Sequence, residues 1–301
     1  MILCLGSVAD DTFIYTVQRL ASFGTAIDVL DVAHLALAGR VSGPLAAPEE
    51  LVISVGWRRY SVGNYDGIFM RMIDLQSFAP TEELGARSAA WQHVLACTLS
   101  LLPARVVNRQ GRSAGNAAKL YHQVLVASRV GLLTPRSLVT TVPERAVEFV
   151  EGCRDGAIIK GASGRKTWVS TVSPPSMGNQ FSRLSECPSL IQERITGEDI
   201  RVHVAGESCH AEAILSADVD YRRTGRARFS QVQLSPDILD ACVRVARCLD
   251  LSFVGIDLKR DVRTGELVFL EANSMPCYQV YDRRASGRIS AALHHWLTTG
   301  S

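Results

Sequence analysis

Two carboxylates and an amide occur on two neighbouring apolar segments near the end of the 301-residue chain. Asp257 interrupts one apolar segment, Glu271 ends the run Val268–Leu270, and Asn273 follows two residues later. Because residues i and i+2 of an extended segment face the same side, Glu271 and Asn273 can point together. A hairpin around Thr264-Gly265 would bring Asp257 beside them. The three side chains would form a hard-oxygen site, suited to Mg²⁺ that also holds nucleotide phosphates.

Each of these polar residues, taken alone, also fits a solvated position at the end of a strand. Their occurrence together in one strand–turn–strand frame favours the metal site over that simpler interpretation.

Lysine is rare in this chain, which makes its positions informative. Only four of the 32 basic side chains are lysines. Lys119 falls in the first turns of a helix that Asn116 can cap, and Lys160 ends an apolar strand just before Gly161-Ala162-Ser163-Gly164. A Gly/Ser loop after a strand lets backbone N–H groups approach an anion, to which a lysine adds charge. For such a loop alone, an ordinary surface turn with a solvated lysine is the stronger interpretation.

Two further segments carry residues suited to a nucleotide or an acidic substrate. Gln192-Glu193-Arg194-Ile195 could line a planar apolar slot, and Asp199 in the following Asp199-Ile200-Arg201 would be free to bind ribose hydroxyls. A basic loop follows at 220–228 and includes Asp220 and Arg222. Arginine suits carboxylate or phosphate because its guanidinium donates two parallel hydrogen bonds. Without further support, these segments are also compatible with a charged turn and a solvated loop.

The first 104 residues alternate short apolar strands with helical segments, which predicts an open α/β domain. Strands are expected at 2–5, 26–31, 51–55 and 67–72, with helices at 12–23 and 86–102. The segment Gly39–Glu50 is rich in Pro, Ala and Gly and is expected to be a surface loop.

The remainder of the chain is predicted to carry a small lid on a larger, strand-rich body. A β-α-β-β pattern occupies about 135–190, with its helix beginning near Pro143. Hairpins are expected between 199–205 and 208–215 and between 252–259 and 266–271, and helices at 235–249 and 286–297.

The composition indicates a globular protein and excludes several function classes. Hydrophobic residues make up 47% and charged residues 21%, which is typical of a chain with a real core. A formal net charge of +2 is too small to predict nucleic acid or a membrane surface as partner. No signal peptide or long apolar segment is recognisable. The eight cysteines form no C-x-x-C pair, so we expect reduced thiols, no zinc site and a cytoplasmic location.

The order of these motifs resembles that of the ATP-grasp superfamily, from about Asn108 to Leu297. The similarity is greatest to the branch that adds amino acids to peptide or protein carboxylates and to the branch that crosslinks ribosomally made peptides. It implies an ATP-grasp domain at 105–301, in which two α+β subdomains clasp ATP, preceded by a small α/β domain at 1–104.

The resemblance also implies a role for each candidate residue. Lys119 and Lys160 would contact ATP, Gln192, Glu193 and Ile195 would form the adenine hinge, and Asp199 would hold ribose. The γ-phosphate and the acyl phosphate would lie near Arg201 and Arg222, and Mg²⁺ would be bound by Asp257, Glu271 and Asn273. Two features depart from the family pattern: the loop after Lys160 is short, and Cys277-Tyr278 replace a small, Gly-containing segment. We interpret Cys277 as a wall residue.

The implied activity is that of a carboxylate–amine ligase that uses ATP and Mg²⁺, with Mn²⁺ as an alternative. The substrate would be an amino acid or a peptide, activated as an acyl phosphate. On the same fold, an ester-forming peptide crosslinker and a small-molecule kinase are alternatives, and a nucleotide-binding relic is a third that the complete set of site residues disfavours. The oligomeric state stays open, although relatives often self-associate.

Overall fold

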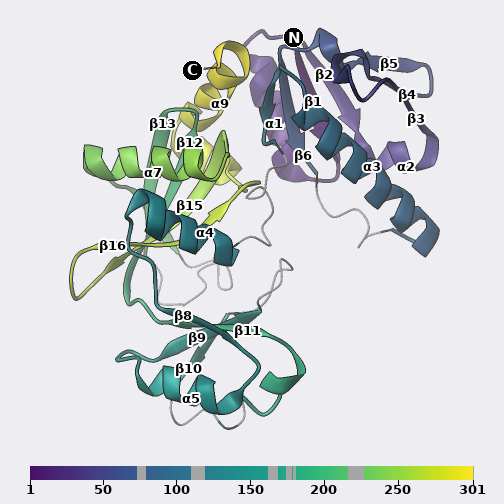
Figure 1. Cartoon of the computed structure of the whole chain (residues 1–301). Coiled ribbons are helices and arrows are strands. Elements are labelled where there is room, and N and C mark those ends of the chain that lie inside the picture. The colour runs from purple at the N-terminus through teal and green to yellow at the C-terminus, as the bar shows by residue number, and fades with distance from the viewer. Residues whose placement is uncertain are drawn as a thin grey trace.

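The computed structural model of the chain describes residues 1–72, 79–109, 119–161, 169–173, 178, 181–215 and 227–300. These residues form four β-sheets flanked by helices (Figure 1). In the same part of the chain, no helix is both long and apolar enough to cross a membrane. The mixture of sheets and helices confirms the predicted α/β class.

A parallel sheet, the first sheet, has strand order β2-β1-β6-β7. Its strands are β1 Ile2–Gly6, β2 Ile27–Asp31, β6 Gly67–Arg71 and β7 Arg105–Val107. β1 is buried along its whole length, as expected for a parallel strand covered on both faces. Its side chains alternate between two cores: Leu3 and Leu5 face one, Ile2 and Cys4 the other.

Three helices and a small second sheet surround the first sheet. The helices are α1 Asp11–Ser22, α2 Val32–Ala38 and α3 Glu82–Ser100, and the second sheet contains β3 Gly39–Ser42, β4 Val52–Val55 and β5 Arg58–Ser61. Asp10 caps α1 by accepting hydrogen bonds from the backbone N–H groups of Thr12 and Phe13. α2 and α3 share the Leu3 and Leu5 core with the second sheet.

The large sheet is antiparallel, with strand order β14-β13-β12-β15-β16. Its strands are β12 Gly197–Ala205, β13 Ser208–Leu215, β14 Arg228–Gln231, β15 Phe253–Asp261 and β16 Leu267–Asn273. One face packs against α7 Pro236–Cys248 and α4 Lys119–Leu125, which continues into the π-helical turn η5 Val126–Val130. α8 Gln279–Arg284 and α9 Arg288–Thr299 share a separate apolar core with residues of the other face, including Ala205 of β12.

The middle sheet, from the centre of the chain, has strand order β10-β9-β11-β8. It contains β8 Ser137–Thr140, β9 Ala157–Gly161, β10 Ser170–Val172 and β11 Ser189–Glu193, with α5 Pro143–Glu151 packed against it. Figure 1 shows this sheet at the opposite end of the molecule from the first sheet. Its apolar core is its own, and the segment 194–196 leads directly from β11 into β12 of the large sheet.

Asn108 joins the first sheet to the large sheet where β7 ends. Its side-chain nitrogen donates to the backbone oxygens of Phe253 and Ser274, both at 2.6 Å, and its side-chain oxygen accepts from the Phe253 N–H at 2.9 Å. Asn108 is only 6% exposed. The amide therefore satisfies three backbone groups that water cannot reach easily.

The structure confirms the two predicted hairpins, β12–β13 and β15–β16. It corrects the surface loop expected at Gly39–Glu50, because Gly39–Ser42 forms β3 and Pro48–Glu50 forms a 3₁₀ turn. β3 exists through its pairing with β4, which the local composition does not reveal. Sequence analysis also missed α2, β5, β14 and α8.

The predicted division of the chain at 104/105 stays a prediction. β7 pairs in parallel with β6, so the first sheet continues to Val107.

We expect Asn108→Ala to lower the free energy of unfolding by about 2–3 kcal/mol, because it leaves buried backbone groups without partners. Denaturant unfolding of the whole chain measures the change. Asn64→Ala is the matched control, since Asn64 is exposed, and should cost less than about 0.5 kcal/mol. Equal effects of the two substitutions would contradict the bridging role of Asn108.

Candidate functional site

The three predicted metal ligands lie together at the end of the β15–β16 hairpin. Asp257 on β15 is directly opposite Glu271 on β16, and Asn273 is opposite Gly255. The Asn273 side-chain nitrogen donates to Asp257 Oδ2 at 3.0 Å and to Glu271 Oε1 at 3.5 Å. Like charges directly opposite each other destabilise a sheet. The pair of carboxylates therefore favours a cation beside it.

The donor set fits Mg²⁺ in its chemistry and leaves room for other ligands. Among the described residues, no cluster of three or more His, Cys, Asp or Glu side chains could hold a metal. Two carboxylates and one amide would therefore leave part of the coordination to water or phosphate oxygens, as Mg²⁺ sites commonly do. Asn273 presents its nitrogen to the carboxylates here, so its oxygen would become a ligand only after the amide rotates.

Arg201 lies on the other side of Asp257, on β12. The two residues are opposite each other in the β12–β15 ladder, and Arg201 Nη1 is 2.6 Å from Asp257 Oδ1. The Arg201 side chain is 8% exposed and that of Asp257 is 25% exposed. Gly255 provides the space for the guanidinium, because a Cβ at this position would overlap it. A cation, two anions and an amide thus meet on three adjacent strands.

Asp199 forms a second cross-strand ion pair beside the first. Asp199 Oδ1 is 2.8 Å from Lys259 Nζ, and both side chains are mostly buried. Along this part of β12 and β15, therefore, negative and positive side chains alternate. Sequence analysis proposed Asp199 for ribose but gave Lys259 no role. The signal was available, because Lys259 follows Asp257 by two residues and such residues share a face of a strand.

The predicted hinge lies where the middle sheet meets the large sheet. Gln192 is 1% exposed, and its amide bonds within the protein to Lys160, Gln123 and Ser137. Glu193 Oε1 accepts from the Arg136 backbone N–H at 3.0 Å.

Ile195 is half-buried in the connecting segment after β11. The Gln192 and Glu193 side chains are already hydrogen-bonded within the protein, so a planar ligand at the hinge would be held by backbone groups instead.

Lys160 reaches the hinge from β9, and its Nζ donates to Gln192 Oε1 at 3.3 Å. Lys119 begins α4, but its side chain lies outside the described residues, as do Arg222 and most of the loop after Lys160. The structural positions of those two side chains therefore stay predictions.

His203 extends the site to a buried aromatic group that sequence analysis missed. Its Nε2 accepts from Arg201 Nε at 3.5 Å, and its ring lies 4.7 Å from that of Tyr281. Burial, reinforced by Arg201, His210 and Arg284, holds the pKa of His203 well below its usual value of 6.5. A neutral imidazole can accept from Arg201, whereas an imidazolium cannot.

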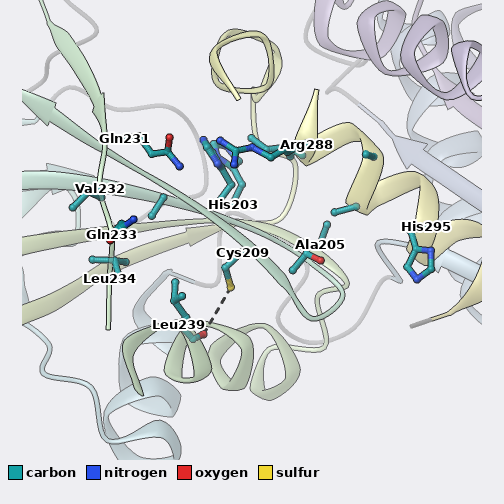
Figure 2. A pocket seen from close by; sticks show the side chains of 16 residues that line it. His203, Ala205, Cys209, Gln231, Val232, Gln233, Leu234, Leu239, Arg288 and His295 are labelled. Carbon is teal, nitrogen blue, oxygen red and sulfur yellow. Dashed lines mark hydrogen bonds between the residues drawn. The ribbon is translucent and has the colours of Figure 1, made fainter. Parts of the chain in front are cut away.

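A cavity of about 620 Å³ lies on the far side of His203, between β13, β14, α7 and α9. Figure 2 shows His203 at one side of this cavity and Leu239 of α7 at another. None of the predicted nucleotide- or metal-binding residues that the structure describes lines it. The cavity is thus separate from the carboxylate pair.

Arg71 connects the first sheet to the segment after Asn273. Sequence analysis missed this contact. From the end of β6, Arg71 donates to Asp10 Oδ2 at 2.8 Å, to the backbone oxygen of Met275 at 2.9 Å, and to Cys277 Sγ at 3.4 Å. Cys277 is exposed. Tyr278 is fully buried and donates to Thr16 Oγ1, so this aromatic residue belongs to the core.

No family model matches the chain, and neither does any curated protein. Solved structures do match. The crystal structure of macrocyclase MdnC bound with precursor peptide MdnA, from Microcystis aeruginosa MRC, has a TM-score of 0.82 and 17% identity over 100% of both chains. The chain has the ATP-grasp fold. A Chryseobacterium gregarium RiPP-associated ATP-grasp ligase, in complex with ADP and a leader and core peptide, gives 0.82 and 18% over 100% of this chain and 97% of that one.

A third ATP-grasp ligase, PsnB complexed with minimal precursor, gives a TM-score of 0.78 and 24% identity over 97% of both chains. The fold class predicted from the motif order is therefore confirmed along nearly the whole chain, including the N-terminal region.

The buried His203 should make the ATP-grasp chain less stable as the pH falls below about 6.5. Between the low pKa of the folded state and the ordinary pKa of the unfolded chain, the unfolded state binds more protons, so stability decreases with falling pH by up to about 1.4 kcal/mol per pH unit. Denaturant unfolding between pH 5 and 8 should show a flatter slope for His203→Gln. An unchanged slope in His203→Gln would refute this assignment.

Gly255→Ala should lower the free energy of unfolding by about 1–3 kcal/mol, because the added Cβ displaces the Arg201 guanidinium. In an Arg201→Ala background the same substitution should cost little, since the obstructing group is gone. A double-mutant cycle by denaturant unfolding measures the difference. Equal costs in both backgrounds would show that Gly255 is required for another reason.

Proposed function

We propose that this chain is an ATP-dependent ligase that joins a carboxylate to an amine through an acyl phosphate. The observation that carries the proposal is the Asp257–Glu271 carboxylate pair, with Arg201 bonded to Asp257, on the large sheet of an ATP-grasp fold. A relic that no longer uses ATP would have no reason to retain two opposed carboxylates, which repel each other, together with Arg201 and Asn273.

Asp257, Glu271 and Asn273 would hold Mg²⁺. The ion, when bound, would neutralise charge on the nucleotide phosphates and position them. Arg201 orients Asp257 through their 2.6 Å contact. The Asn273 side-chain nitrogen donates to both carboxylates, and the amide would rotate to present its oxygen to the cation.

The nucleotide would lie between the middle sheet and the large sheet. The segment 194–196 gives the adenine a backbone edge, Lys160 and Lys119 supply positive charge, and the middle sheet, as part of a lid at about 135–190, excludes water. Asp199 would reach ribose only by sharing or leaving Lys259, which lies 2.8 Å away.

In the first step, an oxygen of the substrate carboxylate attacks the γ-phosphorus, the bond to the bridging oxygen breaks, and ADP leaves. In the second, the amine nitrogen attacks the acyl carbon, phosphate leaves with the bonding electrons, and the amine proton passes to phosphate or solvent. Arg201 and Arg222 would stabilise the negative charge on the transferred phosphoryl group and the acyl oxygen. Exclusion of water protects the acyl phosphate between the two steps.

We propose a peptide as substrate. Structures of the same fold hold peptides: MdnC is bound with a precursor peptide, and the Chryseobacterium gregarium ligase holds a leader and core peptide together with ADP. PsnB has also been solved with minimal precursor, Mg and ADP. The acidic side chains of a peptide would supply the carboxylate, and the basic loop 220–228 would attract them.

The proposal is tested by Mg²⁺-dependent ADP formation with and without synthetic peptides that contain Glu or Asp together with Lys and Thr. ADP formation that rises with a peptide, and a peptide product lighter by one water, would support the ligase. A lysine crosslink that resists mild alkali is an amide, whereas a threonine crosslink cleaved by alkali is an ester. Transfer of phosphate to the substrate without loss of water would instead identify a kinase.

Glu271→Gln should reduce ADP formation by roughly a hundredfold or more, because it removes one of the charges that hold the metal and phosphates in place. Steady-state ADP formation at saturating Mg²⁺ measures the effect. Glu266→Gln is the matched control at the exposed turn of the same hairpin and should retain wild-type turnover. Full activity in Glu271→Gln would exclude Glu271 from the metal site.

A further inference from the structure

We propose that Gln123 is a positioning residue that couples Lys160, in the middle sheet, to β16, the strand that carries Glu271. The inference rests on the proposed function and concerns how its nucleotide and metal contacts depend on each other. Gln123 lies on α4, which packs against β16 of the large sheet. It is thus placed between the two sheets that would enclose ATP.

A continuous series of hydrogen bonds leads from Lys160 to β16. Lys160 Nζ donates to Gln192 Oε1 at 3.3 Å, and Gln192 Nε2 donates to Gln123 Oε1 at 3.2 Å. Gln123 Nε2 then donates to the backbone oxygen of Leu270 at 2.9 Å. Leu270 immediately precedes Glu271, so the last acceptor belongs to the strand position next to the metal ligand.

The direction of this series is fixed by chemistry. If the Gln192 amide were reversed, its NH₂ group would face the Lys160 ammonium. If the Gln123 amide were reversed, its oxygen would face the Leu270 carbonyl oxygen. Each reversal places two donors or two acceptors together, so the lysine at one end and the carbonyl at the other determine both amide orientations.

Burial makes the series costly to break. Gln192 is 1% exposed and Gln123 is 6% exposed, so water cannot easily replace a lost partner. Ser137 Oγ accepts from Gln192 Nε2 at 2.8 Å, and its one proton can be donated either to the Pro135 carbonyl oxygen at 3.0 Å or to Gln123 Oε1 at 3.3 Å. Ser137 therefore supports the series at the side but is not needed for its continuity.

The consequence is a coupling between nucleotide and cation. Movement of Lys160 towards a phosphate must pull on Gln192, and through Gln123 it changes the position of β16 beside Glu271. By linkage, cation binding at Glu271 then affects the affinity for nucleotide by the same factor. Two backbone segments also join these sheets, but neither includes Lys160. The segment 194–196 ends at β12, and the segment 131–136, which leads into β8, accepts a hydrogen bond from the Phe269 N–H of β16 on the Leu133 carbonyl oxygen at 2.8 Å.

The experiment measures ADP affinity by calorimetry with and without Mg²⁺ in the full-length chain. The ratio of the two dissociation constants gives the Mg²⁺ enhancement. Gln123→Met keeps the shape of the side chain but removes the two hydrogen bonds that link Gln192 to Leu270, and should reduce this enhancement about fivefold or more. ADP affinity without Mg²⁺ should change much less. Ser137→Ala is the matched control: it alters the same amide cluster and should leave the enhancement as in wild type.

Gln123→Glu is a second variant, because it retains an acceptor for Gln192 but places an oxygen against the Leu270 carbonyl. It should lose the enhancement as Gln123→Met does. An unchanged enhancement in a folded Gln123 variant, or an equal loss in Ser137→Ala, would overturn the proposal. So would unfolding of both Gln123 variants at a temperature where Ser137→Ala is folded, since Gln123 would then be structural only.

The two proposals fail in different ways. Wild-type chain that binds no ADP, with or without Mg²⁺, would contradict the ligase and remove the basis of the coupling. Wild-type chain that binds ADP with Mg²⁺ enhancement, together with Gln123 variants that keep it, would leave the ligase intact and exclude only the coupling.

Discussion

Two carboxylates held directly opposite each other on neighbouring strands are the constraint on which the rest of the site depends. Asp257 and Glu271 cannot separate, because the β15–β16 ladder fixes their positions. The surrounding groups reduce the resulting repulsion: Arg201 pairs with Asp257, and Asn273 donates to both acids. The two carboxylates are thus held side by side on paired strands before any cation binds.

The large sheet can maintain this arrangement because one of its faces is apolar and the other carries charged side chains. On one face of β12, Ile200 and Val202 belong to the apolar core against α7, and the burial of that core supplies the stability. On the other face, alternate residues carry charge, and Gly255 leaves the volume that the Arg201 guanidinium occupies. An ordinary core on one side therefore stabilises a strongly polar surface on the other.

Sequence analysis could predict that Asp257, Glu271 and Asn273 lie together because their meeting depends on one short hairpin. The spacing of Asp257, Glu271 and Asn273 fixes which of them share a face once the turn forms. Sequence analysis could not identify the contacts that these residues receive from distant segments of the chain. Arg201 meets Asp257 only because β12 pairs with β15, which follows it by about fifty residues. Arg71, at the end of β6 in the first sheet, reaches Met275 just after β16 of the large sheet. Gln123 carried no signal, because a glutamine in a helix is usually solvated.

The large sheet is joined to the first sheet and to the middle sheet by different kinds of contact. Its junction with the first sheet contains fully buried apolar groups, including Phe253 and Tyr278, so separating them would expose a large apolar area. The apolar core of the middle sheet is confined to that sheet. Its connections to the large sheet include the amide series through Gln123, whose hydrogen bonds are buried and therefore costly to break. The first and large sheets thus share an apolar core, whereas the middle sheet is joined to the large sheet by backbone segments and by hydrogen bonds with defined donors and acceptors.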